Sequence, residues 1–407
     1  MRRVGTAIVG CGNIASFYLN TLHQHPILNV IGVTDKDKAR AEKYAQYYSV
    51  ECYSSLDAIL DDQRVELVVN LTNPRSHYTV SRACLEAGKH VYSEKPLAMK
   101  LSEAEHLVQI AEQKSLLIAS APSRILAETA QTMWKALREK TIGAVHAVYA
   151  EMDGGLIYRA GYKEWKNELD IPWPYRDEFE VGCTIEHAGY PVSWLTAYFG
   201  QVDTVTAFGT CQITDMQTDI PLEVTPPDLT VACIRFKSGV VARLTSSWIA
   251  PPDHSIRVFG DTGVLSTDDS WEPRSPVYIT RWRNVRIGPK TISVPWKKNY
   301  SMAAPPGSSP STRLARMFMR PPRDILRAVH ARIRHLRERV DFCIGPAELA
   351  ASLCERRPCR LSARYCLHNT EVVLAIHNAL EHAGDTGHTY KVKTSFEPMT
   401  PMPWAMQ

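Results

Sequence analysis

The stretch EVGCTIEHAGYPVSW places a carboxylate, an imidazole and a phenol within five positions, at Glu186, His187 and Tyr190. Each of these groups can hold or transfer a proton, so the stretch could supply the acid and the base of an enzyme. The alternative is an ordinary helix start whose polar side chains cap the backbone. The stretch alone does not distinguish the two, because a proton-transfer centre needs partner groups from elsewhere in the chain.

A second polar pair follows an apolar strand pattern in HVYSEKPLA, where Glu94 and Lys95 precede Pro96. Adjacent charges are rare at a buried strand end unless a partner satisfies them. The carboxyl end of a parallel strand is also where open α/β sheets bind ligands. A structural salt bridge is the alternative, but Pro96 restricts Lys95 to an extended conformation and so fixes its direction. We therefore predict that Glu94 and Lys95 belong to a ligand site.

The sequence AIVGCGNIA has the spacing Gly10-x-Gly12-x-x-Ala15 between a predicted strand and a helical pattern. The first glycine permits a tight turn, the second lets the backbone approach a pyrophosphate, and a small third residue allows close helix packing. The amide groups and the dipole of the following helix favour phosphates. We expect Asn13 and Ile14, within this turn, to contact the same cofactor.

The second strand pattern, VIGVTD, ends at Asp35, about twenty residues after the glycine turn, as an acid that binds a dinucleotide ribose should. Asp35 could equally cap a turn or a helix. Because a carboxylate here repels a 2′-phosphate, NAD is the favoured cofactor. The neighbouring cations Lys36, Lys38 and Arg40 leave NADP open.

Short strand patterns alternate with amphipathic helical patterns over the first third of the chain, which predicts parallel βαβ units and a doubly wound Rossmann sheet. After about Arg124 the strand patterns lengthen and are joined by Lys-Ser-Gly and Asp-Thr-Gly turns, which predicts an antiparallel sheet. We therefore expect an α/β chain, with a Rossmann domain over residues 1–123 and an α+β domain over residues 124–407.

The composition is that of a globular protein: 407 residues, 44% of them hydrophobic and 22% charged. A net charge of +4 does not imply a nucleic-acid partner. No window reaches the ~18 unbroken apolar residues of a membrane span, and the first residues lack the apolar core of a signal peptide. Ten scattered cysteines without a C-x-x-C pair indicate free thiols in a cytoplasmic protein and no zinc site.

A basic insert is expected at about residues 303–340, and its 313–339 stretch is rich in arginine. The apolar residues that recur there at three- and four-residue spacing are Ile325, Val329, Ile333, Leu336 and Val340. This spacing predicts an amphipathic helix. A surface helix with solvated arginines is the favoured interpretation, and a membrane-surface or nucleic-acid role is the alternative.

Together these motifs resemble the glucose-fructose oxidoreductase/inositol dehydrogenase family, abbreviated Gfo/Idh/MocA. The resemblance rests on the glycine turn, on NLTNPRSHYTVSRACLEAGKHVYSEKPLA and on the two-domain layout. It is close over the first domain and looser over the second. It implies that the second domain binds the substrate and contains a large open sheet, whose face packs on the cofactor and often forms an oligomer interface. We accordingly expect a homo-oligomer.

The resemblance also implies roles for single residues. Those that should line the cofactor are Thr72, Asn73 and His77. Glu94 should touch the nicotinamide ribose, and Lys95 should reach both the cofactor and the substrate hydroxyl. Pro96 corresponds to a proline whose preceding peptide bond is typically cis. Arg124 lies near where family members place a substrate-side arginine.

The family's second-domain signature has an aspartate and, four residues later, a histidine, at the start of a helix that ends at a glycine. Counting back from Gly200 aligns Glu186 with the aspartate, Tyr190 with the histidine and Gly182 with a preceding glycine. Both polar residues depart from the commonest pattern, although tyrosine transfers the proton in glucose-fructose oxidoreductase itself. In a register shifted by one, His187 would match the aspartate and a proline would replace the base, so that register is rejected.

Oxidation of a secondary alcohol needs a hydride acceptor and a group that takes the hydroxyl proton. Tyrosine is a poor base at neutral pH, but the ammonium of Lys95 would favour its phenolate. Glu186, one helical turn before Tyr190, could bind a sugar hydroxyl or hold the lysine. Because proline fits only the first helical turn, Pro191 leaves open a later helix start, with His187 as the base. We favour Lys95 and Tyr190.

An aromatic loop ahead of the motif includes Tyr158 and Trp165, which could stack on a sugar ring or pack among themselves. The expected function is an NAD(P)-dependent dehydrogenase or reductase acting on a secondary alcohol or ketone of a sugar, sugar derivative or cyclitol. One alternative is a glycosidase that oxidises its sugar transiently with NAD. Another is a non-catalytic dinucleotide-binding sensor.

Overall fold

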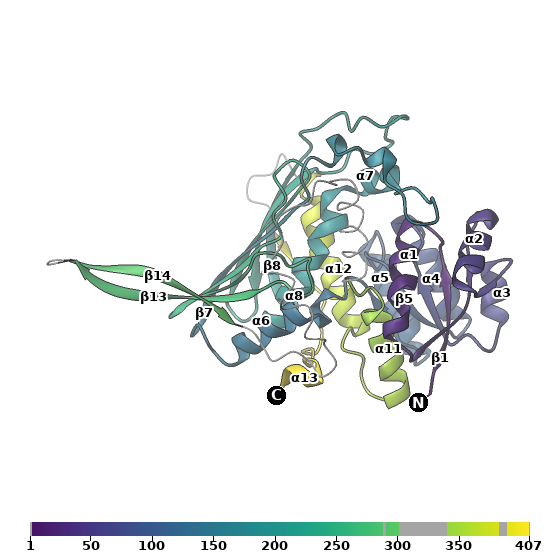
Figure 1. The fold of residues 1–407 in the computed structure, drawn as a ribbon, viewed down its shortest axis with the longest axis horizontal. Coiled ribbons are helices and arrows are strands. Elements are labelled where there is room, and N and C mark those ends of the chain that lie inside the picture. Colours follow the sequence, from purple (N-terminus) through teal and green to yellow (C-terminus); the bar gives the residue numbers. More distant parts are fainter. Residues whose placement is uncertain (1, 288–289, 301–339, 382–388, 407) are drawn as a thin grey trace, which may run out of the picture.

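The computed structural model describes residues 2–287, 290–300, 340–381 and 389–406. The basic insert expected at 303–340, with its predicted amphipathic helix, lies outside these residues except for Val340. Two sheets and the helices packed on them make up the described chain (Figure 1). None of the described helices is long and apolar enough to cross a bilayer.

The first sheet is parallel and has the strand order β3-β2-β1-β4-β5-β6. Its strands are β1 (Val4–Val9), β2 (Leu28–Thr34), β3 (Glu51–Cys52), β4 (Leu67–Asn70), β5 (His90–Ser93) and β6 (Ile118–Ser120). The helices between them are α1 (Asn13–Thr21), α2 (Lys38–Tyr48), α3 (Leu56–Asp61), α4 (His77–Glu86) and α5 (Leu101–Gln113). The predicted Rossmann sheet is confirmed. Its strand order reverses between β1 and β4, the switch point at which such sheets bind ligands.

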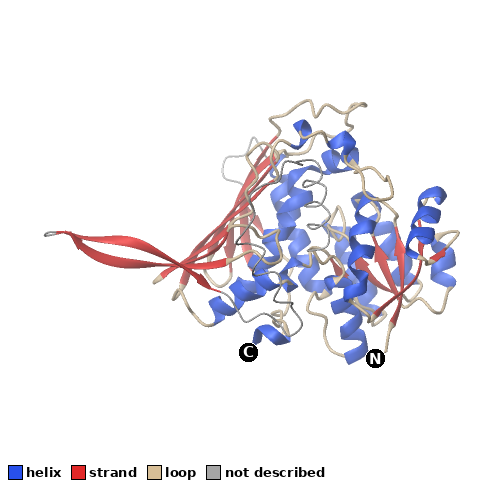
Figure 2. Cartoon of the chain, viewed as in Figure 1, coloured by secondary structure: helices blue, strands red, loops and turns tan. Residues whose placement is uncertain are grey.

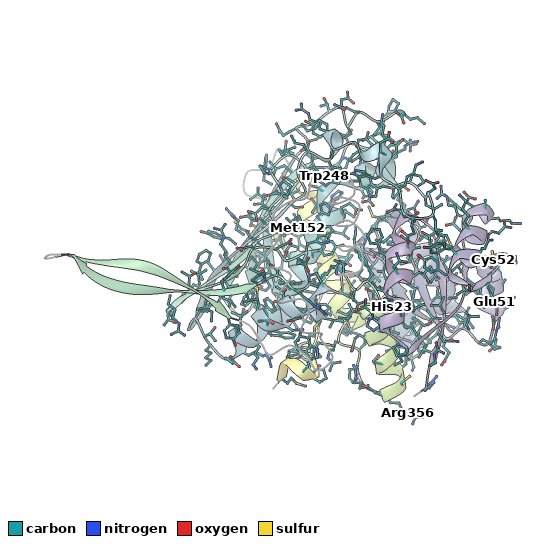
Figure 3. The ribbon with its side chains drawn as sticks, viewed as in Figure 1. His23, Glu51, Cys52, Met152, Trp248 and Arg356 are labelled. Atoms are coloured by element: carbon teal, nitrogen blue, oxygen red, sulfur yellow. The ribbon has the colours of Figure 1, made fainter. Side chains whose placement is uncertain are left out.

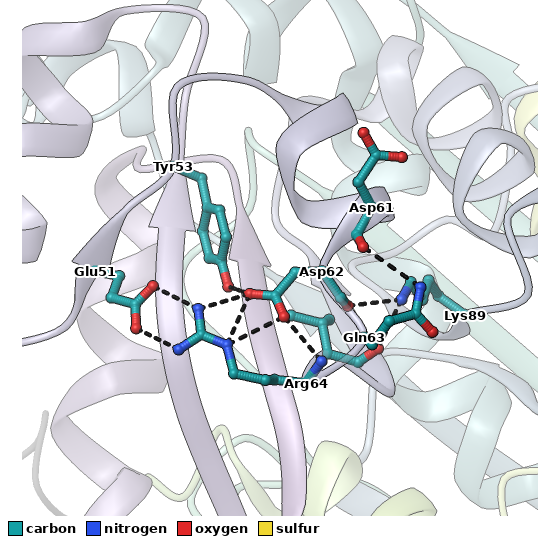
Figure 4. Close-up of polar contacts among 8 residues, drawn as sticks. Glu51, Tyr53, Asp61, Asp62, Gln63, Arg64 and Lys89 are labelled. Carbon is teal, nitrogen blue, oxygen red and sulfur yellow. Dashed lines mark hydrogen bonds and ion pairs between the residues drawn. The ribbon is translucent and has the colours of Figure 1, made fainter.

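A network of polar side chains stabilises the edge of this sheet at the short strand β3 (Figure 4). Arg64 donates two hydrogen bonds of 2.7 Å to Glu51 and another of 2.7 Å to Asp62. Tyr53 donates to the same aspartate at 2.6 Å, and the buried Lys89 donates to two main-chain oxygens of this loop. These contacts compensate for the small number of backbone hydrogen bonds that a two-residue strand can make with its neighbour.

The second sheet has nine strands in the order β14-β13-β12-β11-β7-β10-β9-β8-β15. They are β7 (Val145–Asp153), β8 (Val202–Thr210), β9 (Leu229–Phe236), β10 (Val241–Ser247), β11 (Ile256–Gly260), β12 (Gly263–Thr267), β13 (Val277–Ile287), β14 (Lys290–Tyr300) and β15 (Thr389–Lys391). Neighbouring strands are antiparallel except for β7 and β10. The prediction of a mostly antiparallel second sheet is confirmed. Strands β13 and β14 project beyond it as a long hairpin (Figure 1).

Helices packed on this second sheet face the first sheet (Figure 2). The helices of this part of the chain are α6 (Glu128–Arg138), α7 (Tyr175–Cys183), α8 (Gly189–Phe199), α11 (Ile344–Glu355), α12 (Ala363–His377) and α13 (Pro403–Met406). Helix α12 contacts α5 and β6 on one side and α8, β8 and β9 on the other, and α11 packs on β2, β5 and β6. One apolar core therefore runs through both halves of the chain.

Helices α7 and α8 are joined by a π-helical turn, Thr184–Ala188, which contains Glu186 and His187. The α-helix proper begins only at Gly189, so Pro191 falls in its first turn, where a missing amide hydrogen is tolerated. The later helix start that the sequence left open is therefore present, but Glu186 already lies in helical backbone.

Gly182→Ala should lower the free energy of unfolding more than Gly200→Ala. Their backbone angles are similar (φ +81°, ψ 164° and φ +83°, ψ −152°) and lie in a region essentially restricted to glycine, so alanine costs about 1–3 kcal/mol at either position. At Gly182 the new methyl would also lie 2.7 Å from Cβ of Pro226, whereas at Gly200 it would meet nothing within 4 Å. Urea unfolding followed by circular dichroism measures both losses, and equal losses would contradict the crowding by Pro226.

Candidate active site

A cavity of about 2300 Å³ is lined by residues of both halves of the chain. It exceeds the ~300–1,000 Å³ of a typical small-molecule pocket, so it has room for a dinucleotide and a second molecule. The glycine turn after β1 and Asp35 form one end of the lining, and Glu186, His187 and Tyr190 belong to the other.

The turn after β1 has the geometry of a dinucleotide-binding loop. Gly10 has φ +101°, and a Cβ there would lie 2.6 Å from the carbonyl oxygen of Leu71. A Cβ on Gly12 would meet nothing within 4 Å and would enter the cavity. Helix α1 begins at Asn13 without a side-chain cap, so its first amide groups can bind an anion. Ala15 is fully buried, as close packing of this helix requires.

Asp35 directly follows β2, and its carboxylate accepts hydrogen bonds from the amides of Cys11 (2.7 Å) and Asp37 (2.8 Å). These bonds orient the carboxylate and leave lone pairs for a ribose in the cavity that it lines. The cations at the same end of the cavity are Lys36, Lys38 and Arg40. The donor set therefore fits the adenosine half of NAD and leaves cations within reach of a 2′-phosphate.

A loop from the second half of the chain closes over the glycine turn. The side-chain amide of Asn13 donates to the main-chain oxygen of Ile171 at 3.0 Å. Asn167 donates to the hydroxyl of Tyr44 at 2.7 Å, and that hydroxyl donates to the carbonyl oxygen of Gly12 at 2.6 Å. The side chain of Asn13 is thus engaged by this loop, while Ile14 lines the cavity.

Thr72, Asn73 and His77 line the cavity, and their side chains organise its backbone. The hydroxyl of Thr72 donates to Asn70 at 2.7 Å, and Asn73 caps a short 3₁₀ turn. The ring nitrogens of the fully buried His77 lie 2.7 Å and 2.9 Å from the carbonyl oxygens of Pro96 and Thr72. Burial lowers the pKa of His77 despite these contacts. The histidine therefore ties the loop after β4 to the loop after β5, where the expected cis Lys95–Pro96 bond is present.

Glu94 and Lys95 follow β5 and line the cavity. Tyr18 donates to one oxygen of Glu94 at 2.6 Å, and the amide of Lys95 donates to the other at 3.0 Å. The ammonium of Lys95 forms a buried ion pair with Glu186. Burial alone would lower the pKa of Lys95, but the Glu186 carboxylate raises it above its ordinary value. Lys95 is therefore a cation at neutral pH.

Glu178 of α7 brings a second carboxyl to this ion pair, and sequence reasoning missed it. It lines the cavity and is hydrogen-bonded to Glu186. Burial, and then the charge of Glu186, raise the pKa of Glu178 well above its ordinary value. Burial also acts to raise the pKa of Glu186, but Lys95 outweighs it and the pKa is lowered. The hydrogen bond between the two carboxyls requires a shared proton, and the charge of Lys95 favours Glu186 as the ionised partner.

Tyr190 stacks on Trp271, with ring centroids 4.7 Å apart and planes 24° apart. Burial raises the pKa of Tyr190 to about 12, although the ammonium of Lys95 acts to lower it. The charge of Lys95 thus acts in favour of the phenolate, as expected, but burial has the larger effect on the pKa of Tyr190. Tyr190 is a neutral phenol, and hence a proton donor, at neutral pH.

His187 lies edge-on to Trp271 at 5.3 Å and to Trp248 at 6.3 Å. Trp248, labelled in Figure 3, in turn packs on Phe179 of α7 at 5.4 Å. Burial lowers the pKa of His187 to about 3. This imidazole therefore does not titrate near neutrality, because the apolar surroundings disfavour its charged form.

The three residues expected to bind the substrate have different surroundings. Trp165 is 40% exposed and lines the cavity. The guanidinium of Arg124 is buried and lies over the ring of Phe342 at 4.9 Å, and burial lowers its pKa. Tyr158 is buried in an aromatic cluster with Phe179 and Trp248. Arg124 and Tyr158 thus lie behind the cavity wall.

Several cavity residues were not indicated by the sequence; they are Asn167, Trp173, Glu178, His254, Asp269, Trp271 and Phe342. The acidic start of α7 was a signal for Glu178, but it is a weak one, because helix starts collect carboxylates whatever their function. His254 precedes β11, whereas Asp269 and Trp271 follow β12, and only the sheet brings them to the π-turn.

Comparison with known proteins extends the sequence resemblance. Residues 4–121 match the family model of the oxidoreductase family with an NAD-binding Rossmann fold, and residues 130–266 match that of the GFO/IDH/MocA C-terminal domain. A putative NADPH-dependent oxidoreductase from Desulfitobacterium hafniense shares the fold, with a TM-score of 0.70 and 19% identity over 96% of this chain and 98% of the other.

Two curated relatives match over 211 residues each. An uncharacterised oxidoreductase of Schizosaccharomyces pombe is 27% identical, over 51% of this chain and 54% of its own length. The scyllo-inositol 2-dehydrogenase (NADP⁺) IolW of Bacillus subtilis is 25% identical, over 51% of this chain and 55% of its own. The chain thus spans about half the length of these relatives. Because both family models match in order along a chain with the corresponding fold, this protein belongs to the Gfo/Idh/MocA oxidoreductase family.

Proposed function

We propose that this protein is an NAD(P)-dependent dehydrogenase or reductase acting on a secondary alcohol or ketone of a sugar, sugar derivative or cyclitol. The observation that carries this proposal is the Lys95–Glu186 ion pair beside Tyr190, in the same cavity as the glycine turn. A nicotinamide dinucleotide, when bound, supplies or accepts the hydride. Family membership and the similarity to an inositol dehydrogenase support a polyol substrate.

Each end of the cavity has a distinct task in this proposal. The glycine turn and the first amides of α1 hold the pyrophosphate, and Asp35 accepts the adenosine ribose hydroxyls. Glu94, oriented by Tyr18 and by the amide of Lys95, accepts hydroxyls of the nicotinamide ribose. The ammonium of Lys95 and the phenol of Tyr190 donate hydrogen bonds to the reacting oxygen, stabilise negative charge on it and move its proton.

The other end of the cavity suits a ring with hydroxyls. Trp271 lies against Tyr190, and Trp165 and Trp173 line the rim, so aromatic faces are available for the apolar face of such a ring. His254 and Asp269, paired at 3.4 Å, offer hydrogen-bonding groups to its edge. A glycosidase with transient oxidation would use the same groups, and an absence of net cofactor turnover would identify it.

We also propose that the protein is a homo-oligomer. Support comes from the face of the second sheet that carries no helix among the described residues (Figure 2). Tyr149, Phe208 and Val241 are exposed there on β7, β8 and β10, and the strand registers place them on one face. Exposed apolar patches of this kind mark protein–protein contacts.

Gly12→Val should abolish NAD(P)H binding without lowering the melting temperature, because its side chain would fill only the open space meant for the pyrophosphate. Asp35→Asn should relax the discrimination against NADPH, since it removes the charge but keeps a hydrogen-bonding group. Asp35→Ser should in addition weaken NADH binding. Calorimetric titration of each cofactor measures these changes, and unchanged NADH affinity in Gly12→Val and Asp35→Ser would contradict the cofactor site.

Lys95→Ala should bind cofactor nearly normally and lose roughly 10²–10⁴-fold in turnover, because the substrate oxygen loses its charged donor. Lys163→Ala is the matched control: this exposed lysine pairs with Asp219 and is not part of the cavity lining. Steady-state kinetics on an accepted polyol measures both variants. Full activity of Lys95→Ala would refute the assigned role.

Tyr190→Phe should reduce kcat far more than it changes KM, because the ring still stacks on Trp271 and only the hydroxyl is lost. His187→Asn should have the smaller effect on kcat. Because the imidazole is neutral above about pH 3, any acidic limb of the pH–rate profile near neutrality should survive in His187→Asn. Loss of that limb in His187→Asn, with a mild effect in Tyr190→Phe, would instead make His187 the base.

A further inference from the structure

Two carboxyl groups and one ammonium meet at the substrate end of the cavity. Glu186 of the π-turn holds the ammonium of Lys95, and Glu178 of α7 is hydrogen-bonded to Glu186 from the other side. Both glutamates and the lysine line the cavity. Glu186 is 6% exposed, whereas Glu178 is only half-buried. Glu178 is thus the more solvent-accessible of the two glutamates.

The charges around Glu178 require this carboxyl pair to hold a proton. The groups whose charges act on it are Glu186, Lys95 and Glu94. One ammonium cannot compensate two hydrogen-bonded carboxylates, because like charges at hydrogen-bonding distance disfavour joint ionisation. The proton lies on Glu178, since Lys95 keeps Glu186 ionised. Such a proton belongs to the pair and can move within it.

The neighbouring side chains cannot store a proton in the same way. Burial keeps the pKa of His187 at about 3, so its imidazole carries no extra proton at neutral pH. The phenol of Tyr190 can donate one proton, but its pKa of about 12 makes the phenolate costly to leave behind. A protonated Glu178 in contact with Glu186 is therefore the store nearest to Lys95.

We propose that Glu178 is a positioning residue for carbonyl reduction, and that with Glu186 it stores the proton that reloads Lys95. This inference rests on the proposed function. A hydride forms the new C–H bond at the carbonyl carbon, and Lys95 gives one proton to the oxygen to form the O–H bond. The proton of the Glu178–Glu186 pair then restores the ammonium of Lys95, which leaves two carboxylates. Glu178 finally takes up a proton from solvent through the cavity.

The stored proton can be tested without turnover, by infrared difference spectroscopy of the full chain at pH 7. A protonated carboxylic acid has a carbonyl stretch distinct from that of a carboxylate, and the band should disappear in Glu178→Gln. Glu180→Gln is the matched control on the same helix. Glu180 is buried but pairs with Arg176 at 3.1 Å, and the surrounding donors lower its pKa despite burial, so the band should persist. An unchanged band in Glu178→Gln overturns the inference.

The delivery step is tested by the reduction of 2-keto-inositol and 3-keto-glucose with NAD(P)H. Glutamine preserves the shape of Glu178 and can donate a hydrogen bond to Glu186, but it cannot release a proton. Glu178→Gln should therefore lower kcat about tenfold or more with little change in KM, and should alter the basic limb of the pH profile. A wild-type kcat and pH profile in Glu178→Gln overturns the inference. If the wild-type protein reduces neither ketone although its infrared band is present, the proposed function is overturned, and the delivery step with it.

Discussion

The buried ion pair between Lys95 and Glu186 is the interaction on which the proposed site depends. Lys95 follows strand β5 of the first sheet, whereas Glu186 lies in the π-turn beside the second sheet, so the pair joins the two halves of the chain. Removing two charges from water costs several kcal/mol per ion, and their attraction offsets this only when the geometry is good and other donors satisfy the carboxylate. Glu178 is such a donor.

Both sides of this ion pair are held by backbone features with little freedom. On the lysine side, His77 contacts the carbonyl oxygens of Thr72 and Pro96 and so connects two strand ends. On the glutamate side, Gly182 takes a conformation essentially restricted to glycine and passes close to Pro226. Helix α12 packs against both halves and so helps to fix their relative position. A site assembled across two sheets needs this rigidity, because small displacements weaken a buried pair.

Burial, more than proximity, determines the protonation of the groups in the cavity. The ammonium of Lys95 lies near Tyr190, but burial still raises the pKa of that phenol to about 12. Burial likewise lowers the pKa of His187 to about 3, although the charge of Glu186 opposes this. At neutral pH the cavity therefore presents an ammonium, a phenol and a carboxylic acid, all of which are proton donors. This resting state suits the reduction of a carbonyl group.

The sequence by itself determined the features whose chemistry is contained in one short segment. The turn from Gly10 to Ala15, the acid at Asp35 and the Glu94–Lys95–Pro96 signature each follow a strand directly, so local spacing predicts both the Rossmann sheet and its cofactor end. Only the tertiary structure brought Glu178 to Glu186, and Trp271 to Tyr190, because these residues approach from separate elements. It also placed Arg124 and Tyr158 behind the cavity wall and decided the protonation of His187 and Tyr190. The physical reason is that burial and charge are summed over neighbours in space, which the order of residues along the chain does not specify.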